Sequence, residues 1–216
     1  MSPACHLVIL AKAPVMGRVK TRLGRAIGAV EATRACRVML AALLRRLGRD
    51  RRWTTWLAVS PDAAARPAWW QGSTRLRLIG QGSGDLGARM QSLFARLPPG
   101  PVVIIGADIP AIAPADIAAA FQALAGHDAV FGPASDGGYW LVGLSRRRPQ
   151  HPFAGVRWSS PHTLADTRAN LAGRRVVLLR ELSDVDTEED HRAWRRAAPA
   201  SPPPRRALSR APSPSR

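Results

Sequence analysis

The feature that most constrains the fold is a regular alternation of short apolar segments with segments of helical periodicity. The run PVVII at residues 101–105 is the clearest apolar segment, and HLVILA at residues 6–11 is another. Such runs are typical of strands that are buried on both faces of a sheet. Between them, apolar residues recur at helical spacing, as over residues 29–48. This alternation predicts an α/β domain with a mostly parallel sheet.

The same criteria predict the remaining elements. We expect strands at 6–11, 53–60, 75–79, 101–105, 128–132, 138–144 and 175–179. We expect helices at 29–48, about 86–97, 114–124 and 162–172, and a last helix capped by Thr187. The strand at 75–79 alternates polar and apolar residues, which predicts a half-exposed edge strand. From residue 198 the chain is Pro/Ser/Arg low complexity, so we expect one domain at 1–197 and a disordered tail at 198–216.

The length and the cysteine pattern exclude several classes of protein. A chain of 216 residues can bury a core without disulfide or metal staples. No apolar stretch approaches the roughly 18 residues that a membrane span needs, and the run 7–10 is too short for a secretory signal. Cys5 and Cys36 show neither metal-ligand nor disulfide spacing. We therefore expect a cytoplasmic protein without a membrane span.

The net charge of +17 is less informative about partners than it first suggests. Of the 32 basic residues only two, Lys12 and Lys20, are lysine, and Ala, Gly and Pro are abundant. This bias is typical of a GC-rich coding sequence, so part of the basicity is compositional. Nucleic-acid binding needs a basic patch beyond such a bias, and we do not expect it as the primary function.

A basic loop follows the first predicted strand, at the edge of the sheet where open α/β folds bind ligands. It contains Lys12, Gly17, Arg18, Lys20, Thr21 and Arg22. Ammonium and guanidinium groups with a glycine and a hydroxyl suit the phosphates of a nucleotide. A solvated basic loop is the alternative interpretation. The loop lacks the GxxxxGK[ST] pattern of a P-loop.

Two acidic positions also follow predicted strands. Asp108 comes directly after the buried run 101–105, and Asp186 lies in the acidic segment 184–190. Mg²⁺ or Mn²⁺ on a diphosphate commonly takes one or two carboxylates from the protein, and these two are our candidates. Alternatively, Asp108 caps a turn before Pro110. Helix capping accounts for the acids after Thr187, but not for Asp184 and Asp186 as well.

Two glycine-rich segments remain. Asp136, Gly137, Gly138 and Tyr139 form a turn that permits close approach of a ligand, although an ordinary hairpin turn also accounts for its glycines. The segment 82–87, GSGDLG, matches the GxGxxG fingerprint of dinucleotide-binding proteins, with Asp108 about twenty residues further on. Because the strand before it looks half exposed, a dinucleotide-binding Rossmann protein is only the lesser alternative.

Six motifs in order resemble a known family. They are KAPVMGRVKTRL, GDLGARM, IGADIPAI, FGPASDGGYWLVGL, FAGVRWSSPHTLADT and LSDVDTEED. Together they resemble the small bacterial GT-A-fold transferases, which are nucleotide-diphospho-sugar transferase-like proteins often labelled glycosyltransferase or selenodomain-associated transferase, formerly a domain of unknown function. The resemblance covers about residues 5–195. Its members often carry Cys or Leu where Ile109 stands here.

The resemblance implies a single-domain GT-A fold, three-layer α/β/α with a mostly parallel mixed sheet, and a role for each motif. Residues expected to bind the nucleotide and its phosphates are Lys12, Gly17, Arg18, Lys20, Thr21, Arg22, Asp85 and Arg89. Asp108 and Asp186 are expected to bind Mg²⁺ or Mn²⁺. Asp136 is the candidate catalytic residue, and Gly137, Gly138 and Tyr139 are expected to contact the substrate.

The expected function is glycosyl transfer from a nucleotide-diphospho-sugar to an unknown small acceptor. The first alternative is a nucleotidyltransferase, guanylyl- or cytidylyltransferase-like, that joins a nucleoside triphosphate to a phosphorylated small molecule. The two differ in what they release: a nucleoside diphosphate in the first case and pyrophosphate in the second. A binding module that has lost its chemistry is a third hypothesis, which the presence of both aspartates and the basic loop disfavours.

Overall fold

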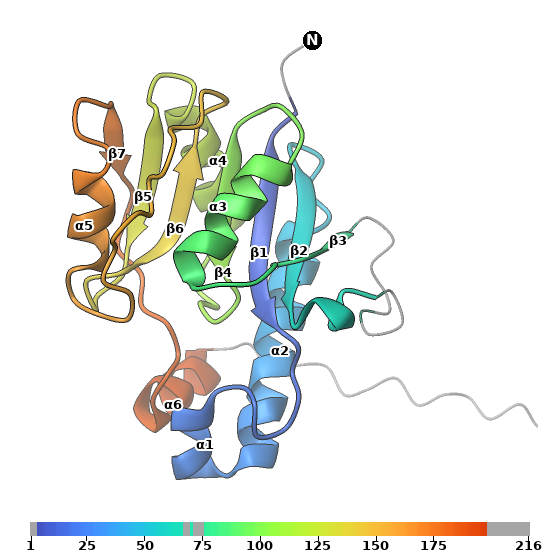
Figure 1. The fold of residues 1–216 in the computed structure, drawn as a ribbon. Helices are drawn as coiled ribbons and strands as arrows, with labels where there is room; N and C mark the ends of the chain where they lie inside the picture. The colour runs from blue at the N-terminus through green and yellow to red at the C-terminus, as the bar shows by residue number, and fades with distance from the viewer. Residues whose placement is uncertain (1–3, 67–69, 71–75, 198–216) are drawn as a thin grey trace, which may run out of the picture.

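A seven-stranded mixed sheet runs through the middle of the computed structural model, which describes residues 4–66, 70 and 76–197 (Figure 1). The order of the strands across the sheet is β3-β2-β1-β4-β6-β5-β7. Four of the neighbouring pairs are parallel, and β6 runs antiparallel to both β4 and β5. The strands are β1 (His6–Lys12), β2 (Thr54–Ser60), β3 (Arg77–Gly80), β4 (Val102–Gly106), β5 (Ala129–Pro133), β6 (Tyr139–Leu144) and β7 (Val176–Leu178).

Helices cover both faces of this sheet and one of its ends. They are α1 (Thr21–Ile27), α2 (Ala29–Leu47), α3 (Leu86–Arg96), α4 (Pro114–Ala123), α5 (Thr163–Ala169) and α6 (Glu188–Ala197), with a short 3-10 helix at Asp62–Ala64. Apolar side chains of α2 and α4 pack on one face, and those of α3 pack on the other. The result is the predicted three-layer α/β/α arrangement.

The core is divided by the sheet, as the alternation of side chains along a strand requires. In β1, Leu7 and Ile9 belong to the cluster shared with α2 and α4, whereas Val8 belongs to the cluster shared with α3. All three side chains are fully buried. A strand that is buried on both faces reads as a continuous apolar run, which is why 6–11 and 101–105 are the clearest strand signals.

A third, smaller cluster lies beyond the carboxyl end of β1. It joins Leu23 of α1, Met39 of α2 and the buried Val185, with Trp194 of α6 packed against them. Figure 1 shows α1 and α6 together at this end of the molecule. The cluster brings the basic loop near residue 20 and the acidic segment near residue 185 into one place, although they are far apart in the sequence.

The predicted elements are confirmed, and one helix was missed. All seven strands are present within one or two residues of their expected bounds, and β3 is an edge strand as predicted. Thr187 caps α6, because its hydroxyl accepts the Asp190 backbone N–H at 3.2 Å. The missed element is α1, which begins inside the segment expected to be a loop. Residue 75 and the tail at 198–216 lie outside the described residues.

The topology argues against the dinucleotide-binding alternative. In that fold, the strand before GxGxxG is central, and the ribose-binding acid ends a strand beside it. Here Gly82–Gly87 follows the edge strand β3, and Asp108 follows β4, with β2 and β1 lying between these two strands. The glycines have local reasons instead: Gly82 and Gly84 have positive φ, and a Cβ at Gly87 would crowd Trp158.

The close contact between β5 and β6 at Gly132 can be tested by adding a single methyl group. Gly132 lies in β5, where a Cβ would overlap the indole ring of Trp140 in β6. We expect Gly132→Ala to lower the free energy of unfolding by about 1–3 kcal/mol, a fall of roughly 2–12 °C in melting temperature. Gly126→Ala is the matched control, because nothing lies within 4 Å of its added Cβ. Equal melting temperatures for the two variants would contradict this packing.

No helix in the described part of the chain is both long enough and apolar enough to cross a membrane.

Candidate active site

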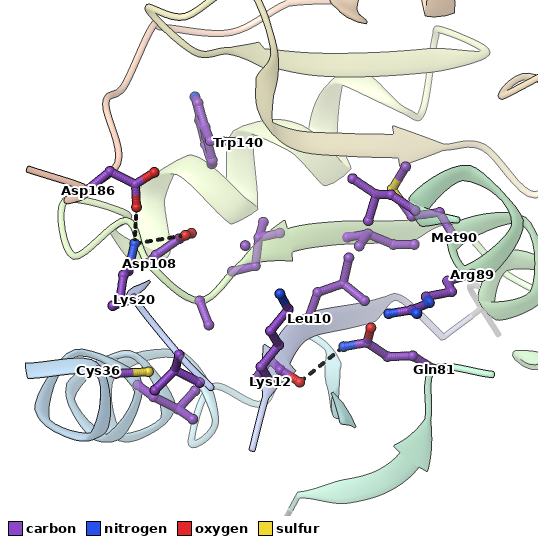
Figure 2. A pocket seen from close by; sticks show the side chains of 18 of the residues that line it. Leu10, Lys12, Lys20, Cys36, Gln81, Arg89, Met90, Asp108, Trp140 and Asp186 are labelled. Atoms are coloured by element: carbon purple, nitrogen blue, oxygen red, sulfur yellow. Dashed lines mark hydrogen bonds and ion pairs between the residues drawn. The ribbon is translucent and has the colours of Figure 1, made fainter. Parts of the chain in front are cut away.

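A cavity of about 630 Å³ opens at the carboxyl ends of β1 and β4. Its lining comes from the basic loop and α1, from the middle of α2 and the start of α3, from the segment after β4, and from β6 (Figure 2). Nine of the residues expected from the sequence line it: Lys12, Lys20, Thr21, Arg22, Asp85, Arg89, Asp108, Tyr139 and Asp186. The chain therefore gathers residues from at least five separate segments into one place.

Lys20 is the residue that joins the basic and the acidic segments. Its ammonium group lies 3.1 Å from Asp108 Oδ2 and 2.6 Å from Asp186 Oδ1 (Figure 2). Burial opposes a charge on Lys20, but the two carboxylates outweigh this and raise its pKa. The side chain is only 9% exposed, so the ammonium group is held in a defined position and stays protonated.

The backbone of Lys20 is in a left-handed conformation, with φ 46° and ψ 46°, which is unfavourable for a residue other than glycine. Such strain persists where the surrounding structure over-determines it, and it concentrates at functional sites. Here the two ion pairs and the buried Val19 beside it hold the turn. The Lys20 carbonyl then accepts the Gly24 N–H at 2.8 Å, which begins α1.

The acidic side of the site is built around Val185. This side chain is buried against Leu23 and Met39, and its backbone N–H donates to the Asp108 carbonyl at 3.1 Å. The anchored valine places its two neighbours, Asp184 and Asp186, beside Asp108. One carboxylate oxygen from each of the three aspartates lies within 4.8 Å of the others.

Asp184 was not among the residues selected from the sequence, although it belongs to the same motif. Burial is the main cause that raises its pKa, to about 6, and the charges of Asp186 and Asp108 add to it. Lys20 opposes this rise in part. Lys20 and the exposed Arg22, whose guanidinium lies 4.0 Å from Asp186, are the cations paired with this cluster. Three carboxylates offer more negative charge than these two cations balance, so the site favours a further cation.

The raised pKa makes a prediction about stability. Between about pH 4 and pH 6 the folded chain keeps a proton on Asp184 that the unfolded chain releases, so the contribution of this group to stability falls as pH rises through 6. We expect Asp184→Asn to stabilise the metal-free protein at pH 8 by about 1 kcal/mol, after allowance for solvent screening, or roughly 2–4 °C. At pH 4.5 the gain should fall to about a third of this, because Asp184 is then neutral in the folded chain while the unfolded chain is already mostly ionised. Thermal melts at the two pH values measure it, and an equal or larger gain at pH 4.5 would contradict it.

The donor set fits a divalent metal ion. Mg²⁺ and Mn²⁺ prefer oxygen ligands. Asp108 and Asp186 line the cavity, and Asp184 places a third carboxylate oxygen within 4.8 Å of theirs. All three side chains are half-buried rather than closed off, which leaves room for the phosphate oxygens and waters that such ions usually retain.

The other end of the cavity carries Gln81, which no sequence motif indicated. Its side-chain nitrogen donates to the Ala11 carbonyl at 3.0 Å and to the Ala58 carbonyl at 2.9 Å. Arg89 lies near it, and its Nε donates to the Gly84 carbonyl at 2.9 Å. Asp85 caps α3 by accepting the Ala88 N–H at 2.8 Å.

Five expected site residues are not among those that line the cavity. Gly17 and Arg18 are exposed in the basic loop. Asp136 accepts the Gly138 N–H at 2.9 Å and so closes its own turn. Gly137 packs against the backbone of Pro161, where a side chain would not fit. The conformation of the turn accounts for Gly137 and Gly138, as the ordinary hairpin interpretation proposed, and one carboxylate oxygen of Asp136 is used within the turn.

Tyr139, at the end of the same turn, does line the cavity. Its ring packs edge-on against Phe131, with 5.2 Å between the ring centroids. Burial raises the pKa of its hydroxyl, which therefore stays protonated and does not act as a base. Sequence reasoning also missed Trp140, whose ring is buried beside the acidic end (Figure 2) and whose Nε1 donates to the Arg180 carbonyl at 3.1 Å.

Comparison with known proteins places the chain in a family. Residues 43–160, more than half of the chain, match a family model described as "Uncharacterized protein conserved in bacteria", DUF2064. The chain belongs to the DUF2064 family. The matched residues of this DUF2064 member include Gln81, Arg89 and Asp108, whereas the basic loop and the acidic segment lie on either side of them. No curated protein matches the sequence.

Solved structures agree with this assignment. The structure of a putative nucleotide-diphospho-sugar transferase from Desulfovibrio desulfuricans G20 is 28% identical, with a TM-score of 0.81 over 91% of this chain and 88% of that one. A CMP:2-keto-3-deoxy-manno-octonic acid synthetase complexed with CTP shares the fold, with 11% identity and a TM-score of 0.59 over 90% and 98%. Rv0371c from Mycobacterium tuberculosis H37Rv in complex with manganese does so too, with 19% identity and a TM-score of 0.51 over 89% and 98%.

These comparisons confirm the predicted fold class and the resemblance on which it rested. The most alike of the three is named as a nucleotide-diphospho-sugar transferase, as the motifs implied. The prediction that this DUF2064 protein is a transferase is thereby confirmed at the level of the enzyme class.

Proposed function

We propose that the protein is a metal-dependent glycosyltransferase that binds a nucleotide-diphospho-sugar in the 630 Å³ cavity. The observation that carries the proposal is the Lys20 ammonium group, which lies between Asp108 and Asp186 and next to a loop that adds Lys12 and Arg22. Cations alone would suit any anion, and carboxylates alone would suit any cation. Their convergence at one end of a cavity suits a diphosphate that is bound together with a divalent ion.

Each group has a definite part in this proposal. Asp108, Asp184 and Asp186 would hold Mg²⁺ or Mn²⁺, which, when bound, would neutralise the charge that develops on a leaving diphosphate. Lys20 would donate hydrogen bonds from a fixed position at the same end of the cavity. Arg22 and Lys12, which are exposed, would neutralise phosphate charge where the cavity opens.

The presence of a manganese complex among similar folds supports the choice of metal, although that structure concerns Rv0371c and is only 19% identical. The 28% identical structure named as a nucleotide-diphospho-sugar transferase supports the choice of substrate.

Nucleotidyl transfer is the second candidate, and the charge of the lining favours it. Lys12, Lys20, Arg22 and Arg89 bring four positive charges to one cavity, which suits a triphosphate and a phosphorylated acceptor as well as a diphosphate. One solved structure of similar fold, 12% identical, is named as a cytidylyltransferase from Leptospira borgpetersenii.

The released product separates the two candidates. The protein is incubated with Mn²⁺, nucleotide sugars and nucleoside triphosphates, together with a mixture of small hydroxylated and phosphorylated acceptors. Release of a nucleoside diphosphate supports glycosyl transfer, and release of pyrophosphate supports nucleotidyl transfer. The Asp108→Asn variant serves as the control for contaminating activity. If neither product forms and no nucleoside phosphate raises the melting temperature, both candidates fail.

A further inference from the structure

The amide of Gln81 is locked in one orientation. The side chain is 5% exposed, and both hydrogens of its nitrogen are taken by backbone carbonyls, those of Ala11 in β1 and Ala58 in β2. The amide oxygen accepts no hydrogen bond from any described residue, yet Gln81 lines the cavity. Gln81 therefore presents a fixed acceptor to whatever enters, and a ligand that displaces water from this oxygen must supply a donor in its place.

Arg89 is held in a similar way, one turn into α3. Its Nε donates to the Gly84 carbonyl at 2.9 Å, and it forms no ion pair with any described residue. The remaining guanidinium N–H groups are free to donate to a ligand. They form a planar fork that matches two adjacent acceptors.

These two side chains lie at the end of the cavity away from the phosphate and metal residues. Figure 2 shows Gln81, Arg89 and Met90 toward one end, with Lys20, Asp108 and Asp186 toward the other. The cavity lining also includes the apolar side chains of Leu10 and Met90, and Figure 2 shows Met90 beside Arg89. Apolar lining with a few fixed polar groups is the usual form of a site for a small organic ligand, and the ring of a base is such a ligand.

We propose that Gln81 and Arg89 read the base of the nucleotide and that they select guanine. The inference rests on the proposed function, because it assumes that the phosphates lie at the Lys20 end. Guanine presents two adjacent acceptors, O6 and N7, to an arginine fork, which is the commonest specific arginine contact with a base. On its other edge the 2-amino group and N1–H are donors for the fixed oxygen of Gln81.

The other bases match this pair of groups less well. Adenine places its N6 amino group beside N7, so Arg89 would face a donor. Cytosine likewise places an amino group at the position that corresponds to O6. Uracil offers Arg89 one carbonyl oxygen at that position and no second acceptor beside it. Each lost pairing leaves either the Gln81 oxygen or the Arg89 fork without a partner inside the cavity.

The test compares ligands before it compares variants, so that it does not depend on the folding of a mutant. Calorimetric titration with Mn²⁺ is carried out for GDP, ADP, CDP and UDP, and for two analogues of GDP. Inosine diphosphate lacks the 2-amino group, and 7-deaza-GDP lacks the N7 acceptor. We expect GDP to bind at least tenfold tighter than the other three bases and about fivefold or more tighter than either analogue.

The variants assign each contact to a residue. Gln81→Met should abolish the difference between GDP and inosine diphosphate, and Arg89→Met should abolish the difference between GDP and 7-deaza-GDP. Arg96→Met is the matched control, because Arg96 also lies on α3 and donates to a backbone carbonyl, that of Gly80, but does not line the cavity. It should leave both differences unchanged. The ratio between two ligands within one variant does not depend on how much the variant is destabilised.

The outcomes separate the inference from the proposed function. If all four nucleoside diphosphates bind equally well, or if another base binds tightest, the inference is wrong and the proposed function stands. If the analogues bind as tightly as GDP, Gln81 and Arg89 do not read these atoms. If no nucleoside diphosphate binds at all, the proposed function fails as well.

Discussion

Replacing Lys20 and Arg22 together by alanine is expected to weaken the binding of nucleoside diphosphates by at least about a hundredfold and to leave nucleosides nearly unaffected. Charge-assisted hydrogen bonds contribute about 1.5–3 kcal/mol each, and 1.4 kcal/mol is a tenfold change in affinity. Lys20 is held in place by two aspartates at 3.1 and 2.6 Å, whereas Arg22 is exposed at the opening of the cavity. A nucleoside has no phosphate with which either residue interacts.

Calorimetry with a nucleoside diphosphate and the matching nucleoside measures this difference. Arg18→Ala is the control within the same loop, because Arg18 is exposed and does not line the cavity, and it should bind both ligands like the wild type. Equal weakening of both ligands in the double variant would mean that the loop shapes the site rather than binding phosphate. The double variant Lys20→Gly with Arg22→Ala removes the same charges, and glycine adopts the φ of 46° without strain, so it should show the same loss if misfolding is not the cause.

The parts of the fold that depend on local patterns were predictable from the sequence. Residues 6–11 and 101–105 are apolar on both faces, so their strands required no knowledge of their neighbours. The helix α1 was missed because its start is set by long-range contacts. It has no side-chain cap, and the left-handed turn at Lys20 is held by Asp108 and Asp186, which are 88 and 166 residues away.

The residues of the candidate site also differ in whether a local sequence pattern or a long-range contact determines their position. The basic loop and Asp108 follow predicted strands, so the rule that ligands lie at the carboxyl ends of strands was enough to select them. Asp184 could have been selected from the sequence as a site residue, since it and Asp186 flank the apolar Val185, which is buried. Gln81 could not have been selected in this way, because its orientation depends on carbonyl groups of two other strands. Asp136 was selected for its motif, but the Gly138 N–H two residues away uses its carboxylate locally.

Asp108→Asn is expected to abolish the stabilisation that Mn²⁺ adds to a bound nucleoside diphosphate, while the protein stays folded. One of three carboxylate ligands is replaced by a neutral amide, which is a weaker ligand for a hard cation. The metal-free protein should lose little stability, because Lys20 keeps its shorter ion pair with Asp186, and one source of repulsion at Asp184 is removed. Asp116→Asn is a suitable control, since that carboxylate pairs with Arg180 away from the cavity.

The most direct measurement is the melting temperature of the wild type and of Asp108→Asn with a nucleoside diphosphate, in the presence and absence of Mn²⁺. A ligand at 100 times its dissociation constant adds about 2.7 kcal/mol, which corresponds to roughly 5–11 °C here. We predict that Mn²⁺ and the nucleotide together stabilise the wild type by an amount of this order, and that Asp108→Asn loses the part that depends on Mn²⁺. A wild type that does not respond to Mn²⁺ with any nucleoside diphosphate, yet is stabilised by NAD, would contradict the metal site and the transferase function together.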